Sequence, residues 1–270
     1  MSDIDTSENL RVTCEIRDHV AEVRLSRPDK LNALDIAMFE RLVELGETLA
    51  ANSDLRAVVL SGDGKAFCAG IDLECLSLLN SPQGHARLLS RSHGIANLFQ
   101  RAALIWRELP VPVIAALHGS VLGGGLQIGL AADIRISAPA TRFSIMESRW
   151  GIVPDMGGTL LLRSLTRADV IRELTYSARM FDAAEALSLG LVTRIADDPR
   201  AEAMALAHEI ATRSPDAIRA AKRLFDASEP LDEAALVRES AEQILLFHGA
   251  DHKEAVRANI ERRTPEFAAR

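Results

Sequence analysis

Apolar and polar positions alternate near the start of the chain, and the spacing becomes helical further on. Residues 11–17 and 19–25 alternate and are separated by a polar pair, which predicts a β-hairpin. Beyond them, short apolar runs are separated by segments with apolar residues every three or four positions. The predicted strands are 55–62, 110–119 and 133–139, and the predicted helices are 36–51 and 84–107. Apolar strands separated by helices indicate βαβ units and a parallel sheet, and therefore an α/β fold.

From about residue 160 the pattern is almost entirely helical, with one possible strand at 191–196. The predicted helices are 167–177, 182–189, 200–213, 215–226, 231–247 and 251–263. We therefore expect two parts, an α/β core over residues 1–199 and a helical region over 200–270. A helical region of this kind typically wraps the core or builds a subunit interface.

Composition narrows the class of protein. Hydrophobic residues make up 48% of the 270 residues, which is enough for a sizeable core. The net charge of −7 argues against nucleic acid or an anionic membrane as the main partner. Three cysteines are too few for a disulfide framework, and their spacing predicts no metal site. An acidic, polar N-terminus and the lack of a long apolar run favour a cytoplasmic protein.

Two glycine-containing loops carry the first chemical signal. Gly123, Gly124 and Gly125 stand between a strand end and a helix start, where free N–H groups favour an anion or a polarised carbonyl. The loop GKAFCAGIDL, residues 64–73, follows another buried strand. Open α/β sheets bind ligands where such loops meet, and two converging N–H groups make an oxyanion hole. Tight strand–helix packing is the structural alternative for the three glycines.

Six segments, taken in order, resemble the motifs of the crotonase, or enoyl-CoA hydratase/isomerase, superfamily. They are RPDKLNALD, SGDGKAFCAGIDL, PVIAALHGSVLGGG, ADIRI, GIVPDMGGT and ALSLGLVTRI, and they cover nearly the whole chain. The resemblance implies a spiral of ββα units with a helical C-terminal region that trimerises, giving a homotrimer or homohexamer. It also implies an acyl-CoA thioester as ligand. By position in the motifs, the N–H groups of Ile71 and Gly124 match the family's oxyanion hole.

Carboxyl groups decide which reaction such a site performs. The family's hydratases carry two glutamates, and the matching positions here are Gln127 and Glu147. An amide can orient water but cannot exchange a proton at neutral pH, which argues against ordinary hydration. Asp155 follows Glu147 by eight residues and resembles the second carboxylate of the dienoyl-CoA isomerases. Those enzymes usually carry Asp where this chain has Gln127. We therefore expect Glu147 and Asp155 to be catalytic in double-bond isomerisation.

The family binds the CoA arm along two loops, largely through backbone groups. Coenzyme A enters as part of the substrate, and no prosthetic group is expected. Arg262 or Arg263 matches a family lysine that meets a CoA phosphate. The substrate-binding residues that the resemblance implies are Leu31, Ala33, Ala69, Gly70, Asp72, Leu73, Gly123 and Gln127.

Other readings of the same residues stay open. Glu147 also suits the N-terminus of a helix electrostatically, and Asp155 after Pro154 suits a turn. An enoyl-CoA hydratase could use Glu147 with water ordered by Gln127. A non-catalytic acyl-CoA binder would keep the fold without turnover, and the charge of −7 disfavours the RNA-binding branch of the family.

Overall fold

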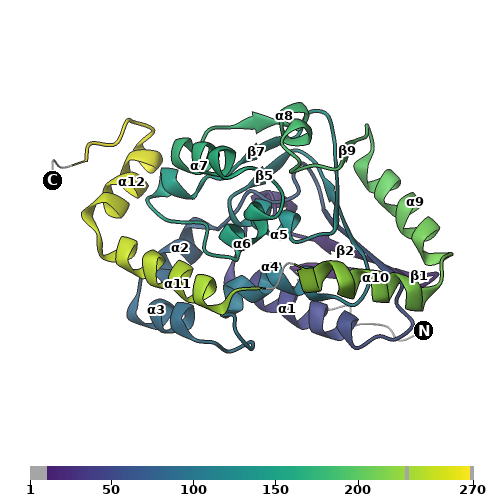
Figure 1. Cartoon of the computed structure of the whole chain (residues 1–270). Helices are drawn as coiled ribbons and strands as arrows, with labels where there is room; N and C mark the ends of the chain where they lie inside the picture. Colours follow the sequence, from purple (N-terminus) through teal and green to yellow (C-terminus); the bar gives the residue numbers. More distant parts are fainter. Residues whose placement is uncertain (1–10, 229–230, 268–270) are drawn as a thin grey trace.

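A six-stranded sheet forms the centre of the molecule (Figure 1), and the computed structural model describes residues 11–228 and 231–267. The strand order is β1-β2-β3-β4-β6-β9. β1 and β2 form the predicted antiparallel hairpin, and the other neighbours pair in parallel. The strands are β1 (Val12–Arg17), β2 (Val20–Leu25), β3 (Ala57–Gly62), β4 (Val113–Leu117), β6 (Ile134–Ser137) and β9 (Arg194–Ile195). The predicted α/β class is confirmed.

A second, three-stranded sheet begins almost directly after β4. Its strands, in the order β5-β7-β8, have only two or three residues each, too few for a periodic signal in the sequence. A bridge between Cys68 and Val121 also joins β5 to the loop that follows β3. The second sheet thereby brings together the loops after β3 and β4. Its strands are β5 (Ser120–Leu122), β7 (Arg142–Ser144) and β8 (Phe181–Asp182).

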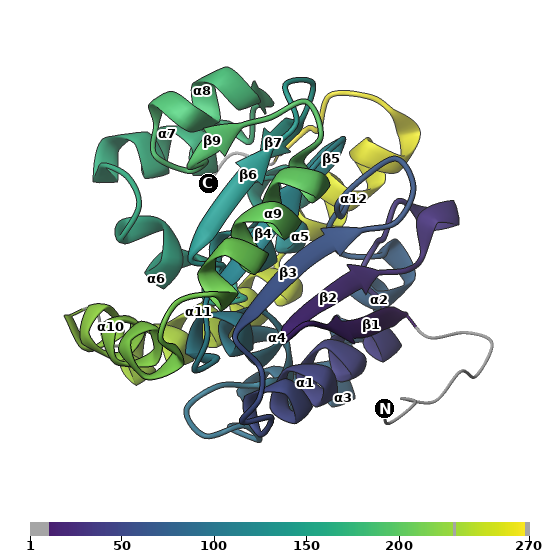
Figure 2. The ribbon, with the colours of Figure 1, turned by 90° about the vertical axis from the view of Figure 1, so that its right-hand side faces the viewer.

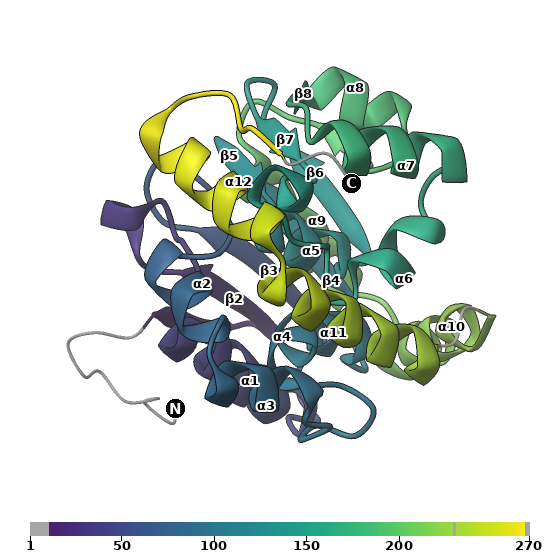
Figure 3. The same ribbon diagram turned by 90° about the vertical axis from the view of Figure 1, so that its left-hand side faces the viewer.

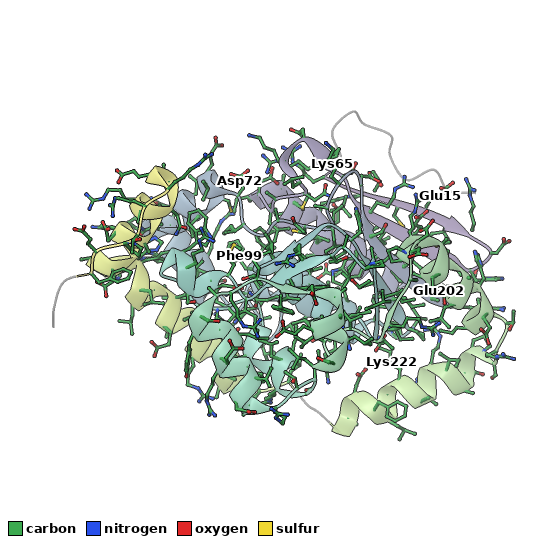
Figure 4. All side chains as sticks on the ribbon, turned by 90° about the horizontal axis from the view of Figure 1, so that it is seen from above. Glu15, Lys65, Asp72, Phe99, Glu202 and Lys222 are labelled. Carbon is green, nitrogen blue, oxygen red and sulfur yellow. The ribbon has the colours of Figure 1, made fainter. Side chains whose placement is uncertain are left out.

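Helices cover both faces of the six-stranded sheet. On one face, α1 (Ile36–Ala50) and α4 (Leu98–Glu108) pack together. The rings of Phe39 and Phe99, the latter labelled in Figure 4, meet edge to face with centroids 5.0 Å apart. On the other face, α9 (Pro199–Ala211) lies across the strands (Figure 2). Small side chains at Ala203, Ala207 and Ala211 let α9 approach the sheet closely.

The single long helix predicted over 84–107 is wrong. The chain instead forms α3 (Pro82–Leu89) and α4, with a non-helical segment between them. Gly94 has a φ of +67° in this segment, and Asn97 begins α4 with a capping box completed by Gln100. The guanidinium of Arg91 donates to the Leu88 carbonyl at the end of α3. These hydrogen bonds stabilise the end of α3 and the start of α4, where the apolar periodicity had predicted one continuous helix.

The C-terminal region is helical, as predicted. α11 (Glu233–His248) and α12 (Ala250–Glu261) run along one side of the molecule beside α2 (Leu73–Leu79) and α3 (Figure 3). α10 (Pro215–Ser228) is tied to the core by Lys222, labelled in Figure 4. The Lys222 ammonium pairs with Asp133 at 2.7 Å and donates to the Val111 carbonyl.

The remaining short elements connect these layers and carry the loops described below. They are η1 (Pro28–Lys30), α5 (Gly124–Leu130), η2 (Glu147–Trp150), α6 (Gly158–Arg163), α7 (Ala168–Ser177) and α8 (Ala183–Ser188). In the described part of the chain, each helix is too short or too polar to cross a bilayer.

Candidate active site

The two glycine-containing loops lie side by side. The amide N–H of Cys68 donates to the Ser120 carbonyl at 3.0 Å, and that of Leu122 donates back to the Cys68 carbonyl at 3.0 Å. A Cβ atom on Gly70 would lie 2.9 Å from the Leu122 oxygen and 3.8 Å from the Gly124 nitrogen. The backbones therefore approach more closely than side chains would allow.

Each of the three consecutive glycines has its own role. Gly123 has a φ of +49°, a conformation that side chains rarely adopt. A Cβ on Gly125 would lie 2.6 Å from both the Cβ and the carbonyl oxygen of Cys68, so this glycine permits tight packing. Gly124 stands between them at the first position of α5. The packing explanation thus holds for Gly125. It also applies to Gly124, where a Cβ would lie 2.8 Å from the Met156 sulfur, but Gly124 in addition has an N–H group that is not used in backbone pairing within the described residues.

The amide groups of Ile71 and Gly124 are the predicted oxyanion donors. Ile71 lies in a parallel bridge with Leu34. The residues on either side of Ile71 make the hydrogen bonds of this bridge: the Leu34 amide donates to the Gly70 carbonyl, and the Asp72 amide donates to the Leu34 carbonyl. Within residues 11–228 and 231–267, the Ile71 and Gly124 amides have no protein acceptor. Two amides left over by the surrounding backbone pairing remain available to a ligand oxygen.

Ile71 and Gly124 both line one pocket of about 170 Å³. The structure brings most of the predicted site residues to this pocket, although they come from three separate stretches of the chain. Apolar side chains of Met146, Trp150, Ile152 and Met156 complete the wall. The predicted residues that line it are Ala69, Gly70, Ile71, Leu73, Gly123, Gly124, Gln127, Glu147 and Asp155.

Glu147 is a buried carboxyl group at the start of η2, only 5% exposed. Its Oε1 accepts a hydrogen bond from the Gln127 amide nitrogen at 2.7 Å. Its Oε2 has no hydrogen-bond partner in the described structure. Burial raises the pKa of Glu147 to about 7, against the bond from Gln127, which lowers it. A buried oxygen without a partner and a pKa near neutrality are the properties of a proton-transfer group.

Both polar atoms of the Gln127 side chain have protein partners, and the residue is 3% exposed. Its amide nitrogen donates to Glu147, while its amide oxygen accepts from the backbone nitrogens of Met156 and Gly158, each at 2.9 Å. One side chain must therefore donate at one end and accept at the other. An amide does this in a single state, whereas an ionised carboxylate can only accept. This explains why an amide stands after the glycines.

Asp155 is partly buried in the loop between η2 and α6 and lines the same pocket. Burial raises its pKa well above the ordinary value, and the negative charges of Glu239 and Glu147 raise it further. Two carboxyl groups thus share one pocket, and both hold their protons more tightly than in water.

Three predicted CoA-binding residues, Leu31, Ala33 and Asp72, are not among the residues that line the pocket. The Ala69 amide donates to the Leu31 carbonyl at 3.0 Å, so the two loops meet there, and Leu31 is exposed. Asp72, labelled in Figure 4, begins α2 as its cap and pairs with Arg27 at 2.7 Å. Arg27 also donates to the Ala33 carbonyl at 3.0 Å. The Asp72 side chain is therefore engaged within the protein.

Of the two arginines at the end of α12, Arg263 is held by protein carboxylates. It pairs with Glu254 at 2.6 Å and with Glu261 at 2.6 Å. Arg262 is exposed, with a φ of +56° where the helix ends. Arg263 is thus engaged within the protein, whereas the Arg262 side chain is exposed.

Sequence reasoning missed Glu239, a carboxyl group on α11 that is 5% exposed. It accepts hydrogen bonds from the amides of Gly157 and Thr159, just after Asp155. Its sequence neighbours carry no motif, and 82 residues separate Glu239 from Gly157. The helix itself was predicted, but nothing in its pattern distinguishes this acidic residue from the others.

Comparison with known proteins gives a family match over most of the chain. The model of the family described as "Enoyl-CoA hydratase/isomerase" matches residues 15–270. The mitochondrial Delta(3,5)-Delta(2,4)-dienoyl-CoA isomerase of Mus musculus is 37% identical over 236 residues, which is 84% of this chain and 72% of that protein. The short-chain-enoyl-CoA hydratase of Clostridium acetobutylicum is 33% identical, with 94% of this chain and 96% of that protein covered.

Solved structures show the same fold. The crystal structure of an enoyl-CoA hydratase/isomerase from Mycobacterium paratuberculosis superposes with a TM-score of 0.85 at 25% identity. The match covers 92% of this chain and 98% of that chain. The arrangement of strands and helices expected from the motif resemblance is confirmed.

Proposed function

The chain belongs to the enoyl-CoA hydratase/isomerase family, and we propose that it is an isomerase that converts a 3,5-dienoyl-CoA into a 2,4-dienoyl-CoA. The observation that carries the proposal is the pair of carboxyl groups, Glu147 and Asp155, in a pocket where the oxygen and nitrogen of the Gln127 amide are both bonded within the protein. Members of the family act on CoA thioesters, so the substrate class follows from membership.

The thioester carbonyl oxygen would accept hydrogen bonds from the amides of Ile71 and Gly124. Negative charge develops on this oxygen when the carbon next to the carbonyl loses a proton. Amide groups fixed in advance stabilise that enolate without reorganising, and loss of one such donor typically costs 10²–10³ in rate.

Glu147 would remove the proton from C2, the carbon between the carbonyl and the first double bond. A Cβ on Gly123 would lie 3.5 Å from Glu147 Oε1, so the carboxyl group adjoins the oxyanion donor at Gly124. A pKa of about 7 leaves a substantial fraction of Glu147 ionised at neutral pH, as a base requires.

Asp155 would supply the second proton at C6. Burial and the nearby carboxylates raise its pKa well above the usual value, which favours the protonated form that such a donor needs. The electron pair released at C2 shifts the double bonds from positions 3 and 5 to 2 and 4, and C6 takes the proton from Asp155. Glu147 ends protonated and Asp155 ionised, and proton exchange restores both before the next turnover.

Hydration of a 2-enoyl-CoA needs one group that activates water and another that protonates carbon. Gln127 stands where the second acid of the hydratases would be, and its oxygen and nitrogen are both engaged within the protein. This occupancy favours isomerisation over hydration.

The test is to incubate the protein with 3,5-dienoyl-CoA, 3-enoyl-CoA and 2-enoyl-CoA, and to follow absorbance and mass. We expect double-bond movement without a change of mass. Glu147→Gln should lower both isomerisations by 10²–10⁴-fold, the usual contribution of a general base. Asp155→Asn should lower dienoyl turnover by at least 10²-fold and spare the 3-enoyl shift, in which Glu147 alone returns the proton.

The matched control is Glu242→Gln, an exposed carboxylate on α11, which should leave all rates unchanged. Gain of one water on 2-enoyl-CoA with no dienoyl turnover would contradict the proposal and favour a hydratase. Saturable CoA binding without turnover on any substrate would mean a binding protein.

We also propose that the protein assembles as a homotrimer or a dimer of trimers, as the motif resemblance implies. Exposed apolar side chains on α10 support this, because Leu224 and Phe225 are 73% and 75% exposed in the single chain. Light scattering of the purified protein tests it, and a monomer would contradict it.

A further inference from the structure

The segment that follows Asp155 is held by two buried side chains rather than by regular backbone pairing. Four consecutive amide N–H groups, those of residues 156–159, donate alternately to Gln127 and to Glu239. Gln127 Oε1 accepts from Met156 and Gly158 at 2.9 Å each, and Glu239 accepts from Gly157 at 2.9 Å and Thr159 at 3.1 Å. We call these four residues the clamped segment.

Glu239 makes further contacts that favour its ionised form. The Thr159 hydroxyl donates to its Oε1, and the Gln100 amide nitrogen donates to its Oε2 at 3.2 Å. Burial raises the pKa of Glu239, while these donors and the two backbone amides lower it. In a glutamine at this position, one oxygen would still accept hydrogen bonds. The other oxygen would be replaced by an NH₂ group, which would face the N–H and O–H donors that now bond to the carboxylate.

A cation is linked to Glu239 through Gln100. The Arg91 guanidinium donates to the Gln100 oxygen at 3.0 Å and to the Ser240 hydroxyl at 3.0 Å. Arg91 lies in the non-helical segment between α3 and α4, where a continuous helix had been predicted. The segment between α3 and α4 thus provides a positive charge that is linked to Glu239 through Gln100.

We propose that Glu239 is a positioning residue for the isomerisation: from α11 it holds the clamped segment and so places Asp155 opposite Glu147 in the pocket. The inference rests on the proposed function. Gln127 performs the same task from α5 and also orients Glu147, so the two clamping side chains connect both carboxyl groups of the site. Asp155 would touch the substrate, and Glu239 acts only through it.

Charge gives Glu239 a second effect on Asp155. The ionisable groups that bear on Asp155 are Glu147 from η2 and Glu239 from α11, with Arg91 behind Gln100. Both carboxylates raise the pKa of Asp155, which keeps its proton available for C6. Removing the charge of Glu239 therefore lowers the pH at which Asp155 loses its proton.

The test compares Glu239→Gln with wild type on 3,5-dienoyl-CoA and 3-enoyl-CoA across pH. We expect kcat for the dienoyl substrate to fall about 10–100-fold, because a misplacement of a catalytic group by about 1 Å lowers the rate by about 10²-fold. KM should change less than about threefold. The alkaline limb of the dienoyl profile should move to lower pH. The 3-enoyl shift, which needs Glu147 only, should stay within about threefold of wild type.

Three further variants separate positioning from general stability. Glu239→Asp keeps the charge and should restore the alkaline limb toward its wild-type position. Glu242→Gln on the same helix should change nothing. If Glu239→Gln fails to fold, Thr159→Val removes one donor from the same carboxylate and should lower dienoyl kcat with KM unchanged.

Two different failures can be told apart. A wild-type protein without dienoyl turnover refutes the proposed function and with it this role of Glu239. The role of Glu239 alone is refuted when the wild type turns over the dienoyl substrate but Glu239→Gln shows an unshifted pH profile and equal losses of rate on both substrates. An unchanged kcat in Thr159→Val refutes it as well.

Discussion

Replacing Glu147 by Gln should change the free energy of unfolding differently at low and at high pH. Relative to wild type, the variant should be more stable at high pH than it is at low pH. Gln has the shape of Glu, and its oxygen can still accept the bond from Gln127. The variant removes only the ability to ionise. Because burial raises the pKa of Glu147 from 4.5 to about 7, the folded wild type resists ionising a group that ionises readily once unfolded.

The size of the effect follows from the pKa difference. Each unit corresponds to about 1.4 kcal/mol, so a rise from 4.5 to about 7 amounts to roughly 3 kcal/mol. The pKa of Glu147 is higher in the folded state than in the unfolded state. The contribution of Glu147 to the stability of the wild type is therefore fully present below pH 4.5 and is lost as the pH rises to 7. The buried amide of the variant carries a cost of about 1–3 kcal/mol for its unpartnered N–H groups, but this cost is the same at every pH.

The measurement is urea unfolding of wild type and Glu147→Gln at pH 4.5 and pH 8.5. The free energy of unfolding of the variant minus that of wild type should rise by about 3 kcal/mol between the two pH values. Glu242→Gln, an exposed control, should show less than about 0.5 kcal/mol. A difference for Glu147→Gln that is the same at both pH values would refute the reasoning, because it would mean that the folded protein does not suppress this ionisation.

Three further substitutions test other contacts. Gln127→Glu replaces the donor to Glu147 by a second carboxyl group, so the acid limb of the isomerase pH profile should move to higher pH; an unmoved limb would contradict the contact. Gly125→Ala should destabilise the protein by about 1–3 kcal/mol in urea unfolding, since the new methyl group would lie 2.6 Å from a carbonyl oxygen of the facing loop; wild-type stability would mean that the loop yields freely. Lys222→Met should lower the unfolding free energy by about 2 kcal/mol, because the pair with Asp133 is lost while the aliphatic stem remains packed; a change under 0.5 kcal/mol would show that the pair does not anchor α10.

Much of the local structure was available from residue types and their spacing. The hairpin, the apolar strands and the C-terminal helices follow from periodicity, since each residue contributes its own burial preference to the element that holds it. The long helix over 84–107 was the exception. There, the capping contacts of Asn97 and the positive φ of Gly94 outweighed the apolar pattern. The strands β5, β7 and β8 were too short to show an apolar pattern.

The residues around the pocket divide in the same way. Gly124 and Asp155 were predicted because they stand inside motifs, and Glu147 because it matches the position of a family glutamate. The bonds of Gln127 were not predicted, because its partners lie 20 to 31 residues away. Glu239 carried no signal at all. Its function depends on α11 reaching the amides after Asp155, and a buried hydrogen bond between segments 82 residues apart exists only once the helices have packed. The amino-acid sequence alone specified which acidic, amide and backbone groups this chain could use for chemistry. Only the packing of the helices and loops in the folded protein determined which of these polar groups lie in contact in its low-dielectric interior.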